Sequence, residues 1–129
     1  RLRHNMKLWV TGSQDWDDPM VIARMITLLI QEMDKEDKDI TFIHLDREGA
    51  EQLAGSYFAK TKTFLSGKGF KVSEFIPAKS SDFDERIRKA LDQSPNILVV
   101  FNKGRDFKTA KIRETAQKNN IPVLEHKNS

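Results

Sequence analysis

Two polar segments of this chain carry residue types that could bind a phosphate-bearing ligand. The segment "TGSQDW", which starts at Thr11, leaves an apolar run through a glycine and ends on an indole. Gly12 lets the backbone turn sharply and approach a ligand closely. Thr11 and Ser13 supply hydroxyls, and Gln14 supplies an amide. Trp16 could stack on a base or cover the mouth of a pocket. A plain strand-to-helix turn, with the indole packed on the next helix, explains the segment equally well, since it is not a GxGxxG pattern.

The second segment, "FNKGRDFKTAKIRE", opens the last helix that the sequence predicts. A glycine followed by polar residues at a helix N-terminus is typical of an anion site, because free N–H groups and the helix dipole point outward. The residues available to an anion here are Asn102, Gly104, Arg105, Lys108 and Thr109. A solvated basic loop is the alternative interpretation. The segment lacks the GxxxxGKS or GxxxxGKT spacing, so it is not a P-loop.

Further candidates follow the second and third predicted strands. His44 ends a strand, and Glu48 with Gly49 starts the next helix. Together with Asp46 these residues lack the further ligand that a metal site needs, so we expect no metal and no cofactor. Arg86 could reach a phosphate, but its "DERIRKALD" surroundings are equally typical of a solvated helix face.

The composition indicates one globular domain. The chain has 129 residues, of which 38% are hydrophobic and 32% are charged. It has no cysteine, which excludes disulfides, zinc–thiolate sites and thiol catalysis. No apolar run approaches the roughly 20 residues that span a bilayer, and no signal-peptide core follows the first basic residues. We therefore expect a cytoplasmic protein with no membrane partner.

The net charge argues against nucleic acid as a partner. Met6 stands directly before the first predicted strand and is interpreted as the natural start, so residues 1–5 are expected to lie outside a single domain spanning residues 6–126. Leaving out Arg1 and Arg3 reduces the formal net charge from +3 to +1, with 20 basic against 19 acidic residues. Such a balance gives little electrostatic attraction to a phosphate backbone.

Five strand-like runs alternate with four helical ones. The strands are predicted at residues 6–10, 40–44, 70–76, 96–101 and 121–126. Three helices are predicted at residues 20–33, 48–67 and 107–119. A further helix is predicted to begin at the capping pair Asp82 and Glu85. Asp18 and Pro19 are suitable residues for the start of the first helix. The last residues, "HKNS", are expected to fray.

This alternation predicts an α/β fold, a Rossmann-like three-layer sandwich with a parallel five-stranded sheet and helices on both faces. For the strand order 3-2-1-4-5, a ligand would bind between the first and fourth strands, at their carboxyl ends. The two polar segments meet at that point.

The same residues resemble the cpYpsA-related branch of the SLOG superfamily, which also includes DprA-like proteins and the LOG cytokinin-activating enzymes. "KLWVTGSQDWDD" is similar to the "VTGSRDW" motif of that branch, and "HLDREGAEQLA" stands where the branch has "HGGARGAD" followed by Leu-Ala. The matching positions are His44, Gly49, Ala50, Glu51, Leu53, Ala54, Pro77, Ala78, Gly104, Arg105, Thr109 and Ala110. The resemblance covers Met6 to Glu125, and it implies a crevice for a nucleotide-derived ligand.

The departures from the family pattern concern the pocket. Leu45 and Asp46 replace two glycines after the histidine, and Glu48 stands for the arginine of the family. LOG-type hydrolases use a "PGGxGTxxE" motif, and the position of its catalytic glutamate holds Ile112 here. LOG-like phosphoribohydrolase chemistry is therefore not expected.

The leading hypothesis is non-catalytic binding of a nucleotide or nucleotide-derived ligand by a sensor or sequestering protein. The second is a degenerate SLOG protein that acts as a protein-interaction module or inhibitor, of a kind that a phage could encode. The third is a nucleotide N-glycosidic hydrolase that uses Glu48. A homodimer or another protein partner fits the apolar helices. The first two hypotheses differ in whether Gly12, Ser13 and Gly104 line an open cavity and whether Leu45 fills it.

Overall fold

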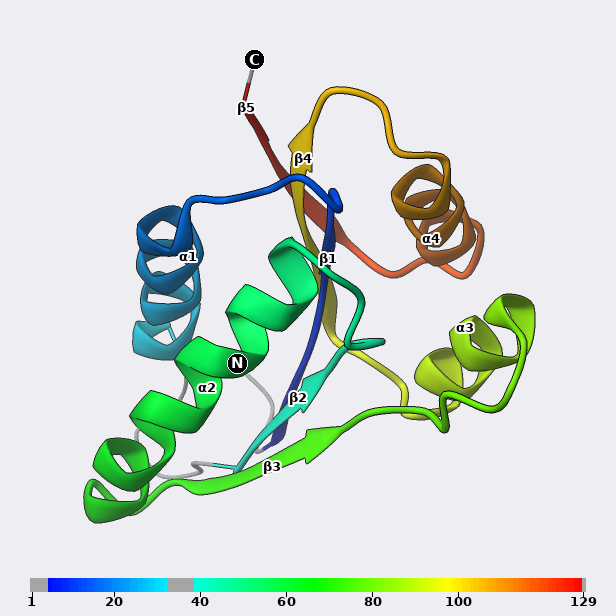
Figure 1. Cartoon of the computed structure of the whole chain (residues 1–129). Helices are drawn as coiled ribbons and strands as arrows, with labels where there is room; N and C mark the ends of the chain where they lie inside the picture. Colours follow the sequence, from blue (N-terminus) through cyan, green and yellow to red (C-terminus); the bar gives the residue numbers. More distant parts are fainter. Residues whose placement is uncertain (1–4, 33–38, 129) are drawn as a thin grey trace.

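The fold is the predicted α/β sandwich. The computed structural model describes residues 5–32 and 39–128. Its elements are β1 (Asn5–Gly12), α1 (Pro19–Gln31), β2 (Asp39–Ile43), α2 (Ala50–Gly67), β3 (Lys71–Phe75), α3 (Phe83–Asp92), β4 (Ile97–Lys103), α4 (Phe107–Lys118) and β5 (Val123–Asn128). Neighbouring strands pair in parallel in the order β3-β2-β1-β4-β5, which confirms the predicted topology. Helices α1 and α2 cover one face of the sheet, and α3 and α4 cover the other (Figure 1).

Local signals set the helix starts. The Asp18 carboxylate accepts hydrogen bonds from the N–H groups of Met20 and Val21, and Pro19 occupies the first helical position. Asp82 caps α3 in the same way, through the N–H of Glu85. Each cap satisfies backbone donors that have no partner inside the helix, so the chain leaves the strand-end loops at fixed points.

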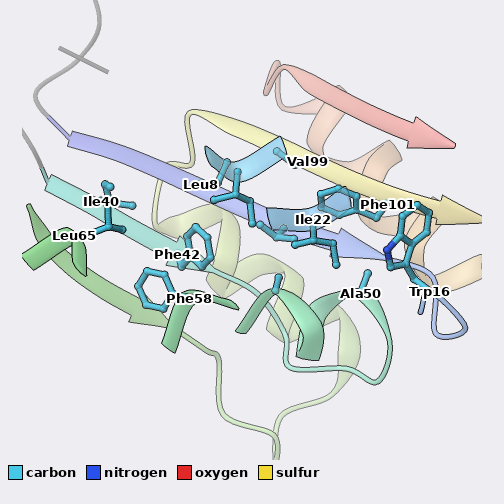
Figure 2. Close-up of a cluster of buried hydrophobic side chains, with 13 residues drawn as sticks. Leu8, Trp16, Ile22, Ile40, Phe42, Ala50, Phe58, Leu65, Val99 and Phe101 are labelled. Atoms are coloured by element: carbon cyan, nitrogen blue, oxygen red, sulfur yellow. The ribbon is translucent and has the colours of Figure 1, made fainter. Parts of the chain in front are cut away.

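Alternation along β1 divides the core into two layers. Leu8 and Val10 join a hydrophobic cluster beneath α1 and α2, where the rings of Phe42 and Phe58 stack with their centroids 4.2 Å apart (Figure 2). Trp9 points the other way, into a second cluster beneath α3 and α4. Burial on both faces explains why the central strands read as continuous apolar runs.

The ends of the chain differ from expectation. Residues 1–5 were expected to lie outside the domain, but Asn5 is part of β1 and lies opposite Asp39. Residues 1–4 lie outside the described part of the chain. The predicted fraying of the last residues is wrong for His126, Lys127 and Asn128. All three pair with β4, because that strand continues to Lys103. None of the helices in the described residues has the length and apolar character that crossing a membrane requires.

Candidate functional site

The carboxyl ends of β1 and β4 bring the two polar segments together. Gly12 lies opposite Phe101 in the sheet, and the N–H of Ser13 donates to the Phe101 carbonyl at 2.9 Å. The Ser13 hydroxyl donates to the Asn102 side-chain oxygen at 3.0 Å and accepts from the N–H of Lys103 at 2.7 Å. Ser13 is fully buried. Its hydroxyl therefore joins the two loops, and it is not offered to a ligand as the sequence had suggested.

Two glycines allow the loops to pack on each other. A Cβ at Gly12 would lie 2.4 Å from the Phe101 carbonyl oxygen and 2.5 Å from the Cβ of Ala50. A Cβ at Gly49, whose φ is +89°, would lie 2.2 Å from the Ser13 carbonyl oxygen. The close approach that requires a glycine at position 12 is therefore to the chain itself, which corrects the expectation that it is to a ligand.

A buried carboxylate organises the floor of the crevice. Glu51 is fully buried and accepts hydrogen bonds from the Thr11 hydroxyl at 2.8 Å and from the N–H of Leu45 at 2.9 Å. It also accepts from the backbone N–H of Arg47 at 3.1 Å and from its guanidinium Nε at 2.9 Å. The far end of that guanidinium donates to the Gly12 carbonyl and to the Thr109 hydroxyl. The network thus ties β1, the β2–α2 loop and α4 together.

Asp106 occupies the N-terminus of α4. One carboxylate oxygen accepts from the N–H of Thr109 at 3.0 Å and the other from the N–H of Gln14 at 2.9 Å. Arg47 Nη1 lies 3.7 Å from the first of these oxygens. Burial opposes ionisation, but the two N–H donors and the guanidinium outweigh it, so the pKa of Asp106 lies below its ordinary value. The Thr109 N–H, predicted to be free for a phosphate, already has an anionic partner.

Several predicted ligand residues have structural roles instead. Trp16 is 2% exposed, packs against Phe101 and His126, and donates from its indole N–H to the Asp18 carbonyl. This is the packed turn that the sequence also allowed, so the face of the indole is not free to stack on a base.

His44 and Arg86 brace the loops beyond β2. His44 is buried; its Nδ1 accepts from the N–H of Asp46 at 2.9 Å, so its Nε2 carries the proton donated to Glu74 at 2.7 Å. Arg86 donates to the carbonyls of Leu45 and Pro77. Its guanidinium therefore binds backbone, which corrects both expectations for it, a phosphate contact and a solvated face.

An open hollow, which we call the first hollow, lies above this floor, between the two polar segments. The first hollow has a volume of about 690 Å³ and is lined by Gln14, Asp15, Arg47, Glu48, Arg105, Asp106, Phe107 and Lys108. Three of these side chains are basic and three are acidic. Phe107 is 86% exposed at its edge. Of the predicted ligand residues, Gln14, Glu48, Arg105 and Lys108 meet here.

The remaining predicted residues lie below or beside the hollow. Thr11 and Thr109 are buried, and Asn102 donates to the carboxylate of Glu125. Gly104 has a φ of +69° and faces open space, but neither it nor Gly12 nor Ser13 is among the residues that line the hollow.

Two positions at which the sequence departs from the family pattern hold buried apolar side chains. Leu45 packs under α3 in the second hydrophobic cluster and does not fill the hollow. Ile112, at the position of the LOG-type glutamate, is buried in the same cluster. It therefore supplies no acid or base to the crevice.

Three residues that shape the site were not predicted from the sequence: Arg47, Asp106 and Phe107. Glu51 was recognised as a family position, but its burial and its role as an acceptor were not predicted. The arginine adjoins Glu48, which had been aligned with the arginine of the family, so a shift of one residue would have found it. Asp106 precedes the predicted start of α4 and could have been recognised as an N-cap. No periodicity indicates that Glu51 is buried or that Phe107 is exposed.

The described residues contain no group of three or more histidine, aspartate or glutamate side chains that could hold a metal ion.

Comparison with known proteins adds no relative. No family model, curated protein or solved structure matches the chain.

Proposed function

We propose that this protein binds a phosphate-bearing nucleotide or nucleotide-derived ligand in the first hollow and performs no chemistry on it. The resemblance to the cpYpsA-related branch of the SLOG superfamily favours the same class of ligand. Since nucleotides are abundant in the cytoplasm, we also propose a cytoplasmic location.

The observation that carries the proposal is an aromatic ring held in solvent next to cations. Phe107 is 86% exposed, although burying such a ring would be favourable by about 1.5–3 kcal/mol. Arg105 and Lys108, which line the same hollow, are exposed on either side of it in sequence. A ring and two cations at one mouth suit a base that stacks and a phosphate that pairs.

Backbone donors add to this anion site. In the first turn of α4, the N–H groups of Phe107 and Lys108 have no acceptor within the described part of the chain. They lie at the positive end of the helix dipole. Arg47, from the loop between β2 and α2, also lines the hollow, and its Nη1 lies 3.7 Å from Asp106. A phosphate placed here would meet donors from two elements.

The acidic residues limit the charge of the ligand. Asp15, Glu48 and Asp106 balance the three basic side chains of the first hollow. A carboxylate next to a phosphate site can accept hydrogen bonds from ribose hydroxyls. The balance therefore favours a ligand of modest negative charge that also carries hydroxyl groups.

Calorimetry with mono-, di- and cyclic nucleotides and nucleotide sugars tests the proposal. Arg105→Ala should weaken binding about ten- to a hundredfold, because a charge-assisted hydrogen bond contributes roughly 1.5–3 kcal/mol. Phe107→Ala should weaken it by about tenfold or more through lost stacking. Arg24→Ala, an exposed arginine on α1, is the matched control and should bind normally. Lack of binding by the unmodified protein across the whole panel would refute the proposal.

A protein-interaction module is the second candidate, and one observation favours it. The hydroxyls of Thr11, Ser13 and Thr109 are all engaged inside the chain, so the crevice floor offers a ligand none of them. In that case Phe107 would contact a protein partner. Phe107→Ala would then leave every small-molecule titration unchanged and weaken only that association.

A further inference from the structure

A second hollow adjoins the first on the side of α2. It has a volume of about 610 Å³ and is lined by Gln14, Asp15, Trp16, Asp17, Glu48, Gly49, Gln52, Leu53 and Ser56. Gln14, Asp15 and Glu48 line both hollows. The two spaces are therefore neighbours that share one wall.

A single hydrogen bond spans the shared wall. Gln14 Nε2 donates to Glu48 Oε2 at 3.1 Å, and both side chains are exposed. An exposed neutral donor on a flexible side chain exchanges its partner for water at little cost. A ligand that extends from the first hollow into the second can therefore displace this bond and reuse the amide and the carboxylate.

The chemistry of the second hollow differs from that of the first. Among the described residues that line it, none is basic and three are acidic. One of the three, Asp17, has its Oδ1 3.7 Å from Lys103 Nζ. A second phosphate would meet three carboxylates here, of which, in the described part of the chain, Asp17 alone has a cation, Lys103, beside it. Carboxylates, an amide and a hydroxyl accept hydrogen bonds from neutral hydroxyl groups, and Leu53 offers an apolar surface to the carbon face of a sugar ring.

We propose that the ligand is a nucleotide joined through its phosphate to a neutral, hydroxyl-bearing group, and that this group occupies the second hollow. The inference rests on the proposed function, since the nucleotide part binds in the first hollow. Glu48 and Gln14 contact both parts of the ligand. Gln52 and Ser56, on the exposed side of α2, contact the sugar part alone.

Matched pairs of ligands test this directly. Calorimetry compares ADP with ADP-glucose, UDP with UDP-glucose, and CDP with CDP-choline, on the whole chain. In at least one hexose pair the conjugate should bind about tenfold tighter than the diphosphate, as expected for about two additional hydrogen bonds. Equal or tighter binding of the diphosphates in both hexose pairs would overturn the inference and leave the proposed function intact. A gain confined to CDP-choline would overturn it too, because the second hollow would then select a cation.

Variants of α2 test whether the sugar part of the ligand binds in the second hollow. Ser56→Trp should fill the second hollow and reduce the hexose preference from about tenfold to less than about twofold. Ser66→Trp places the same residue on the exposed far end of α2 and should keep the preference. Gln52→Ala, a smaller change, should reduce the preference about threefold. Circular dichroism checks that each variant is folded. A preference unaffected by both Ser56→Trp and Gln52→Ala would refute the placement. Absence of binding by both members of every pair would also overturn this inference, and the proposed function would fall with it only if the mono- and cyclic nucleotides fail to bind as well.

Discussion

Replacing Glu51 by alanine tests whether the buried carboxylate holds the crevice floor together. The side chain is fully buried and accepts four hydrogen bonds, from the Thr11 hydroxyl, the Leu45 N–H, and the Arg47 N–H and Nε. Alanine would leave the two backbone N–H groups, the Thr11 hydroxyl and the Arg47 Nε without the acceptor that they share, while the far end of the guanidinium keeps its bonds to Gly12 and Thr109. Because the Glu51 side chain is fully buried, water cannot freely reach the donors that the carboxylate leaves behind.

The structure sets the size of the effect. Breaking a buried ion pair by removing one partner costs about 3–5 kcal/mol. Arg47 keeps a second anion, Asp106, at 3.7 Å, and its side chain is 14% exposed, so the lower end of the range applies. We expect the free energy of unfolding to fall by about 3 kcal/mol for Glu51→Ala. Glu51→Gln should cost less, about 2 kcal/mol, because its amide oxygen can still accept from the backbone N–H groups.

Urea unfolding followed by circular dichroism measures both values. With a slope of about 1.5 kcal/mol per molar urea, Glu51→Ala should lower the midpoint by about 2 M. Glu114→Ala removes an exposed carboxylate from α4 and is the matched control, with an expected change within about 0.5 kcal/mol. A loss below about 1 kcal/mol for Glu51→Ala would contradict the reasoning, because it would mean that water or a rearranged side chain satisfies the stranded donors.

Two further predictions concern the same loops. Gly12→Ala should destabilise the fold by about 3 kcal/mol or more, because its Cβ would meet the Phe101 carbonyl oxygen at 2.4 Å; Gly67→Ala, with no atom within 4 Å of the new Cβ, is the control, and equal midpoints for the two variants in thermal unfolding would contradict the packing. The lowered pKa of Asp106 means that its ionised form stabilises the fold above the unfolded pKa of about 4, and that this contribution is lost as the pH falls through the lower folded value. Asp106→Asn should therefore be less stable than the unmodified protein at pH 6, and the difference should shrink toward pH 2; a gap that widens on acidification would show that the sign is wrong.

The position of the site followed from the sequence, because strand and helix signals are local. Apolar runs such as residues 96–101 predict central strands, and Asp18 and Asp82 mark helix starts within a few residues of the donors that they cap. Right-handed crossovers then restrict the possible strand orders. The crevice between β1 and β4 was therefore predictable before any contact was known, and so was the part that Arg105 and Lys108 play in lining it.

Only the tertiary structure decided which polar groups remain available to a ligand. Ser13 and Asn102 are 89 residues apart and use each other's hydrogen-bonding groups, and Thr109 reaches Gly12 across 97 residues. A hydroxyl has the same residue type whether it faces solvent or a partner, so no periodicity distinguishes the two cases. The Trp16 indole is buried and the Phe107 ring is exposed for a similar reason. Burial of a loop residue depends on where distant elements pack, and that is fixed only when the whole sheet has formed.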